Sequence, residues 1–141
     1  MLFLREEQHS YSHRVPVRHN ARIKEEMARL PGLIEGWLAD GGHHRHDKTL
    51  SETAASLGVS SSALYYYFQK KMGEDFRSWR TKKRIGDAKK LLLEEPDTPV
   101  FQIGERVGYS DRSNFTRNFR LLTGVTPARW RQQHLGEEVI L

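Results

Sequence analysis

The stretch IGERVGYSDRSNFTRNF, residues 103–119, decides the fold, because AASLGVSSSALYYYF at residues 54–68 repeats its pattern. In both stretches a small residue, a glycine and a serine recur at one spacing: Ala54, Gly58 and Ser60, then Gly104, Gly108 and Ser110, at an offset of 50. After one inserted residue the match resumes at an offset of 51, pairing Leu64, Phe68 and Gly73 with Phe115, Phe119 and Gly124. The repeat predicts two copies of one pair of short helices.

Each copy has the pattern of a helix-turn-helix. A small residue lets the two helices cross closely, a glycine makes the turn, and apolar residues on the second helix face inward. The opposite face of that second helix is then available to enter a DNA major groove. One such pattern is common in helical hairpins, whereas two copies on a basic chain favour DNA binding.

The rest of the chain predicts further helices around this repeat. Residues 74–95 contain no proline and carry apolar residues at helical spacing, which predicts one long linker helix. Pro31 is expected to open the first helix, and Gly41-Gly42 to end it. The expected N-terminal caps and start signals of the later helices are Thr49, Ser60, Thr98 with Pro99, Ser110, and Thr126 with Pro127.

No window alternates as a half-buried strand does, so the predicted class is all-α. Seven helices are expected to form two helix-turn-helix subdomains joined by a long linker helix. The predicted organisation is a tail or linker over residues 1–30, a first subdomain over 31–73, the linker helix over 74–95, a second subdomain over 96–134 and a tail over 135–141.

Composition limits the function classes. The chain has 141 residues, with 23 Lys and Arg against 18 Asp and Glu, and the resulting net charge of +5 favours polyanionic partners. It has no cysteine and no apolar run near the roughly 20 residues that span a bilayer, so a cytoplasmic protein is expected. The phosphate-loop, zinc-protease and serine-hydrolase motifs are absent, so neither an enzyme nor a cofactor is predicted.

Specific motifs make the chain resemble the DNA-binding region of the AraC/XylS family of bacterial transcription regulators over about residues 33–132. The resemblance rests on three segments: Arg84-Ile85-x-x-Ala88-x-x-Leu91-Leu92, Ile103-x-x-x-Val107-Gly108-Tyr109-Ser110-Asp111-x-Ser113-x-Phe115-x-Arg117-x-Phe119, and Thr123-Gly124-x-Thr126-Pro127-x-x-Trp130-Arg131. Phe76-Arg77-x-Trp79 is similar to a subgroup in which this region follows a membrane-embedded sensor, which implies that an upstream region is missing from this chain. Residues 58–68 also resemble the recognition helix of tetracycline-repressor-type regulators, but a second helix-turn-helix follows here.

The resemblance implies that both recognition helices contact double-stranded DNA in adjacent major grooves. Residues carried over from the family are Ser61, Ser62, Tyr65 and Tyr66 in the first helix, and Arg112, Ser113, Asn114 and Arg117 in the second. The second set also follows from the residues themselves, because arginine pairs with guanine and asparagine with adenine. Tyr65 and Tyr66 could contact phosphates or merely cover the hairpin.

Other groups are weaker candidates. One or two members of the basic run Arg80, Lys82, Lys83 and Arg84 are expected to contact phosphate, the alternative being an ordinary solvated helix face. The loop group of His43, His44, His46 and Asp47 is not expected to hold a metal, because four ligands within five residues rarely surround one ion. Trp37, Trp79 and Trp130 are expected in the core.

A function from another class stays open. In this alternative the paired hairpins form a protein-interaction module that contacts RNA polymerase or another regulator without reading DNA. RNA polymerase is also the second partner considered for a DNA-binding regulator. No heptad seam extends over several repeats, so a monomer is expected.

Overall fold

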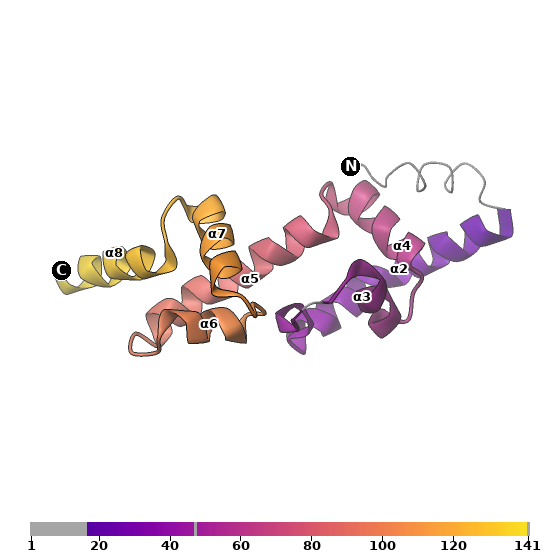
Figure 1. The fold of residues 1–141 in the computed structure, drawn as a ribbon. Helices are drawn as coiled ribbons and strands as arrows, with labels where there is room; N and C mark the ends of the chain where they lie inside the picture. The colour runs from indigo at the N-terminus through magenta and orange to yellow at the C-terminus, as the bar shows by residue number, and fades with distance from the viewer. Residues whose placement is uncertain (1–16, 47, 141) are drawn as a thin grey trace.

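The computed structural model describes residues 17–46 and 48–140, and within them every regular element is helical (Figure 1). The elements are α2 (Val17–Ala39), η1 (Gly42–His44), α3 (Leu50–Leu57), α4 (Ser61–Tyr67), η2 (Phe68–Met72), α5 (Phe76–Glu94), α6 (Val100–Arg106), α7 (Arg112–Thr123) and α8 (Pro127–Ile140). The predicted all-α class, with two helix-turn-helix units joined by a long helix, is confirmed.

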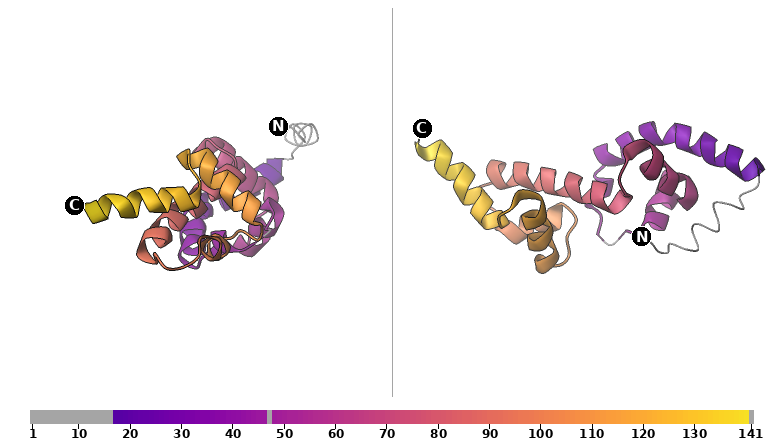
Figure 2. Two further views of the ribbon diagram at one scale, coloured as in Figure 1. Left: turned by 60° about the vertical axis from the view of Figure 1, so that its left-hand side comes forward. Right: turned by 90° about the horizontal axis from the view of Figure 1, so that it is seen from above.

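Helix α5 belongs to two hydrophobic cores. Phe76 and Trp79, in its first turn, pack into a core with α2, α3 and α4, whereas Ile85, Ala88 and Leu92 pack into a second core with α6 and α7. The two cores therefore lie toward opposite ends of one helix, as Figures 1 and 2 show. In Figure 1, α4 and α7 both lie along the upper side of the molecule, one toward each end of α5.

The two recognition helices match element by element. The α4–η2 segment covers residues 61–72, α7 covers residues 112–123, and both end at a glycine in the left-handed region, Gly73 with φ 71° and Gly124 with φ 87°. Helix α4 differs in its last turn, because η2 is π-helical. Both ends of the recognition helix therefore follow the offset of 51.

That offset explains why the predicted cap of the second recognition helix was wrong by one residue. Ser60 caps α4 by accepting a hydrogen bond from the Ala63 backbone N–H, as predicted. In the second copy the inserted residue, Asp111, takes the equivalent place and accepts from the Ser113 N–H, so Ser110 is not the cap.

The first helix corrects a second prediction. Pro31 does not open a helix, because α2 begins at Val17 and continues through Pro31 to Ala39. A proline inside a helix loses one backbone hydrogen bond and crowds the preceding turn. Burial outweighs this cost, since Ile23, Leu30, Ile34 and Trp37 form one buried stripe that crosses the proline at helical spacing.

Two other helix ends differ from prediction. Helix α6 begins at Val100, one residue later than expected, and the Thr98 hydroxyl donates to Glu95 Oε1 instead of capping α6. Helix α8 continues to Ile140, so the segment predicted as a tail from residue 135 is helical as far as that residue. Arg131 stabilises the end of α5 by donating to the Leu92 and Glu95 carbonyls. Among the described helices, none is long and apolar enough to cross a membrane.

Candidate nucleic-acid interface

Helix α7 is held against the second core by its apolar face. Phe115 and Phe119 are almost fully buried there. A Cβ added at Gly104 of α6 would lie 2.6 Å from the Phe115 ring, so only glycine permits this close crossing of α6 and α7. The opposite face of α7 is thereby turned to solvent.

All four residues predicted to contact DNA from the second subdomain lie exposed in the first half of α7: Arg112, Ser113, Asn114 and Arg117. Two of the side chains are already oriented. The guanidinium of Arg112 lies 5.2 Å from the centroid of the Phe101 ring, and Arg117 Nη1 donates to Asn114 Oδ1 at 2.7 Å. The structure therefore brings this set together on one solvent-facing surface.

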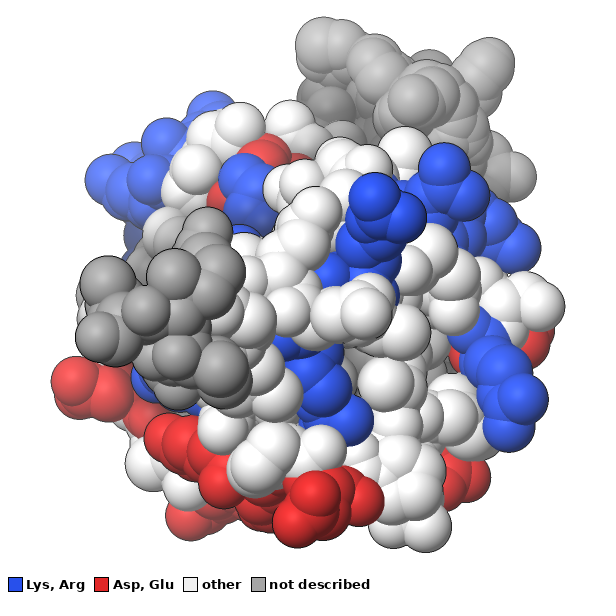
Figure 3. All heavy atoms as spheres, turned by 90° about the vertical axis from the view of Figure 1, so that its left-hand side faces the viewer, with Lys and Arg blue, Asp and Glu red and all other residues white. Residues whose placement is uncertain are grey.

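A shallow groove runs along this surface and adds residues that the sequence reasoning missed. It is lined by Arg112, Ser113, Thr116, Arg117, Arg120, Leu121 and Gly124. Arg112, Thr116 and Arg120 follow one another at intervals of four residues, a spacing that the sequence could have revealed. At this end of the molecule, Lys and Arg side chains extend over the upper and middle surface, whereas most acidic side chains gather along the lower edge (Figure 3).

The predicted first reader is a less polar surface. Ser61 is exposed, and Ser62, Tyr65 and Tyr66 are partly buried. The rings of Tyr65 and Tyr66 meet edge to face with centroids 5.3 Å apart, and Tyr66 packs against the first core. The two tyrosines therefore cover the hairpin as well as presenting their hydroxyl groups.

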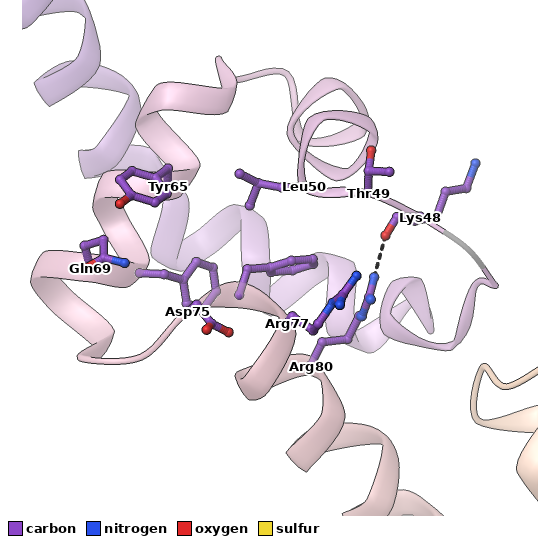
Figure 4. Close-up of a pocket in the computed structure, with 10 residues that line it drawn as sticks. Lys48, Thr49, Leu50, Tyr65, Gln69, Asp75, Arg77 and Arg80 are labelled. Carbon is purple, nitrogen blue, oxygen red and sulfur yellow. Dashed lines mark hydrogen bonds between the residues drawn. The ribbon is translucent and has the colours of Figure 1, made fainter. Parts of the chain in front are cut away.

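A hollow of about 270 Å³ lies beside Tyr65, between the start of α3, the end of α4 and the start of α5 (Figure 4). Three basic residues line it, Lys48, Arg77 and Arg80, and Arg80 Nη1 donates to the Lys48 carbonyl at 2.6 Å. Lys48 and Arg77 were not predicted as site residues because they lie outside both the repeat and the basic run.

The start of α4 is fixed by a buried carboxylate on α2. Glu26 Oε1 accepts hydrogen bonds from the Ser60 N–H at 3.1 Å and from the Ser60 hydroxyl at 2.7 Å. Burial alone would raise the pKa of Glu26, but the bonds from Ser60 and the nearby Arg22 outweigh it and hold that pKa below its ordinary value. The charged Glu26 thus anchors the cap of the first recognition helix.

The basic run of α5 divides into one buried and three surface residues. Arg84 is buried, and its guanidinium donates to the His43 carbonyl at 2.6 Å and to the Arg45 carbonyl at 2.9 Å. Arg84 therefore serves the fold, and the expectation that one or two members of the run contact phosphate rests on Arg80, Lys82 and Lys83. Lys82 pairs with Glu74 at 2.9 Å and Lys83 lies 5.6 Å from the centroid of the Trp79 ring, but both remain exposed, while Arg80 is partly buried.

The histidine loop joins the first subdomain to the linker helix. His43 and His44 each place Nε2 2.7 Å from the same oxygen, Asp87 Oδ2 on α5, whereas His46 donates to the Glu105 carbonyl. Burial lowers the pKa of His43, an effect that its bond to Asp87 only partly offsets. Of the loop group weighed in the sequence, Asp47 lies outside the described residues, and the three histidines divide between Asp87 and Glu105.

Comparison with known proteins identifies this arrangement. A family model described as a helix-turn-helix domain matches residues 53–133, more than half of the chain. The chain is 34% identical over 82 residues to the arabinose operon regulatory protein of Salmonella typhimurium, a match covering 58% of this chain and 29% of that protein. The chain belongs to the AraC/XylS family. The matched part corresponds to the DNA-binding region of these transcription regulators.

Further AraC/XylS relatives agree. The transcriptional activator NphR of a Rhodococcus species is 33% identical over 110 residues, covering 78% of this chain and 31% of NphR. Among solved structures, the C-terminal domain of AraT, a response regulator from Geobacillus stearothermophilus, superposes with a TM-score of 0.63 at 30% identity, covering 72% of this chain and 84% of that one. The matched part of this chain spans about three tenths of the length of the arabinose operon regulatory protein and of NphR.

Proposed function

We propose that this chain binds a specific duplex DNA sequence by placing α4 and α7 in successive major grooves, and that it thereby regulates transcription. The observation that carries the proposal is the outward face of α7, where Arg112, Arg117 and Arg120 line one groove on a helix held from behind by Phe115 and Phe119. Arginine supplies both phosphate contacts and bidentate pairing with guanine.

The two subdomains are proposed to contribute unequally. Helix α7 offers arginine guanidinium groups to base edges, whereas α4 offers serine and tyrosine hydroxyls, which suit phosphate contacts. Lys48, Arg77 and Arg80 beside Tyr65 support a phosphate-binding role for the first subdomain. A module that binds only protein is not favoured, because the chain matches a helix-turn-helix family model and its relatives are transcription regulators.

Selection from a random duplex pool tests this function. We expect enrichment of a sequence with a sharply defined half contacted by α7 and a weaker half one helical turn away. Affinity for that sequence should fall steeply with salt, by a slope of about −0.9 for each phosphate neutralised. No enrichment, together with an affinity insensitive to salt, would overturn the proposal.

Further partners follow from the family. We propose that the DNA-binding region acts in the cytoplasm together with a sensor region, and that it contacts RNA polymerase at regulated promoters. Activation is the favoured direction, because NphR is described as a transcriptional activator. Transcription in vitro from a promoter carrying the selected sequence tests the direction: we expect more transcript when the chain is added, and less would indicate repression.

A further inference from the structure

Three metal-ligand atoms meet where the loop after α2 contacts the linker helix. His43, His44 and Asp87 each offer one ligand atom, and these atoms all lie within 4.8 Å of one another. Two imidazole nitrogens and a carboxylate oxygen are a donor set that Zn²⁺ favours. The loop alone did not predict this set, because Asp87 lies 43 residues beyond His44.

From this geometry we propose that His43, His44 and Asp87 form a binding site for a divalent transition metal of the zinc class. Bonds of about 2.0–2.1 Å to a tetrahedral ion place neighbouring ligand atoms roughly 3.3 Å apart. Each histidine Nε2 is 2.7 Å from Asp87 Oδ2, so an opening of about 0.6 Å admits the ion. Coordination through Nε2 requires each neutral imidazole to carry its proton on Nδ1, so ion binding replaces the two Nε2–H hydrogen bonds to the carboxylate and moves both protons to Nδ1.

The loop is held rigidly around the three ligands. Arg84 bonds the carbonyls of His43 and Arg45, and the His43 ring lies 6.1 Å from that of Trp37. A Cβ at Gly42 would lie 2.3 Å from the Trp37 ring, so glycine lets the loop pack directly on the first core. Ligands positioned in this way lose little conformational freedom when an ion binds.

One side of the cluster is open to solvent. His43 is buried, but His44 and Asp87 keep 30% and 35% of their side-chain surface exposed. They line a hollow of about 280 Å³ with Lys90, Leu91, Glu94 and Arg106. Three protein ligands with an open fourth position leave room for a water molecule or an exchangeable anion. A bound ion would cross-link the first subdomain to α5.

Zinc titration of the full chain, prepared without a polyhistidine tag, tests the site. By calorimetry we expect one saturable equivalent, and by circular dichroism a zinc-dependent rise in Tm, because ligand binding to the folded state stabilises it. Asp87→Asn and His44→Gln should each weaken binding by at least about tenfold and abolish the rise in Tm.

Two control variants separate this site from other histidines. His46→Gln removes an imidazole from the same loop that donates to Glu105 instead, and it should leave zinc affinity unchanged. His9→Gln/His13→Gln/His19→Gln removes the N-terminal histidines and should also bind one equivalent. The proposal is overturned if zinc fails to bind, or if a folded Asp87→Asn variant binds as tightly as the parent chain. Neither result depends on DNA binding.

Discussion

At the scale of single residues, the pair of Asn114 and Arg117 sets the specificity expected of α7. Both were predicted to contact bases, but Asn114 Oδ1 accepts a hydrogen bond from Arg117 Nη1. The same oxygen would be needed for bidentate pairing with adenine. The Nε–Nη2 edge of Arg117 stays available for guanine, so we propose that Arg117 reads a base and that Asn114 positions it.

This pair gives a prediction for DNA affinity. Arg117→Ala should cost about 1–3 kcal/mol on the selected duplex and relax the preference at one base pair. Asn114→Ala should cost less, relax the same base pair, and add nothing in the Arg117→Ala background. Affinities over all single-base variants of the duplex measure both effects, with Tyr66→Phe as a milder control. Relaxation at two separate base pairs would show that Asn114 reads independently.

Glu26 predicts a dependence of stability on pH. Its pKa lies below the ordinary value, so its contribution is complete above that ordinary value and is lost as pH falls through the lowered one. Glu26→Gln should lower the free energy of unfolding by about 1–2 kcal/mol at pH 7, because hydrogen bonds to a charged acceptor are stronger. In urea unfolding, the gap between the two proteins should narrow on acidification.

The matched control is Glu25→Gln, which removes an exposed carboxylate from the next position of α2. It should change stability by no more than about 0.5 kcal/mol. A gap between parent and Glu26→Gln that stays constant from neutral to acidic pH would show that the charge of Glu26 does not anchor α4.

At the scale of elements, the two copies of the repeat solve one packing problem in two ways. The first copy has Ala54 and Leu64, both buried, at the positions that Gly104 and Phe115 hold in the second. Gly104→Ala should therefore destabilise the second subdomain by about 1–3 kcal/mol, because the added methyl overlaps the Phe115 ring. Thermal unfolding measures the loss.

The double variant Gly104→Ala/Phe115→Leu rebuilds the pairing of the first copy and provides the control. It should be more stable than the sum of its two single changes predicts, since the leucine side chain makes room for the methyl. Strict additivity would mean that the α6–α7 crossing does not depend on this contact.

Helix α5 gives a prediction about rigidity. Gly86 is exposed one residue after α5 enters the second core at Ile85, and a Cβ there would meet no atom within 4 Å, whereas Ala88 is buried in that core. Gly86→Pro removes a backbone donor and bends the helix at a cost of about 3 kcal/mol. Gly86→Ala, at the same position, should stabilise by about 0.5–1 kcal/mol.

In DNA binding, the proline variant should lose affinity strongly while keeping most of its helical circular dichroism, because each core can still form. The alanine variant should bind like the parent. A folded Gly86→Pro protein with parental affinity would show that a straight α5 is not required.

Periodicity and local chemistry made much of the fold predictable. The repeat located both helix pairs, and the Thr49 capping box formed as expected. Local signals failed where distant residues decide the outcome. Pro31 resembles a helix start, yet α2 continues through it because apolar residues before and after the proline, such as Leu30 and Ile34, are buried. In sequence Arg84 resembles its basic neighbours. In the structure it is buried and donates to the carbonyls of His43 and Arg45, which lie 41 and 39 residues away.

Periodicity also made the exposed face of α7 predictable. A helix that is buried through Phe115 and Phe119 presents its opposite face to solvent. The bond between Asn114 and Arg117, and the meeting of His43 with Asp87, depend on rotamers and on the path of the chain. Sequence spacing places Asn114 and Arg117 on one helix face without giving their rotamers, and it carries no information on a contact between His43 and Asp87, which are 44 residues apart.

At the scale of the whole molecule, we propose that α5 sets the distance between the two subdomains. Its 19 residues span about 28 Å at about 1.5 Å each, near the roughly 34 Å between successive major grooves on one face of DNA. Arg84 and His46 add contacts across the junction, through the histidine loop and Glu105. These contacts favour a fixed spacing between α4 and α7 over independent movement of the two subdomains.

Hydroxyl-radical footprinting on the selected duplex tests most directly whether α4 and α7 occupy successive major grooves. The predicted result is two protected tracts on one face of the duplex, about one helical turn apart. Arg117→Ala should weaken protection mainly in the tract contacted by α7. A single protected tract at saturating protein would contradict simultaneous docking of the two recognition helices.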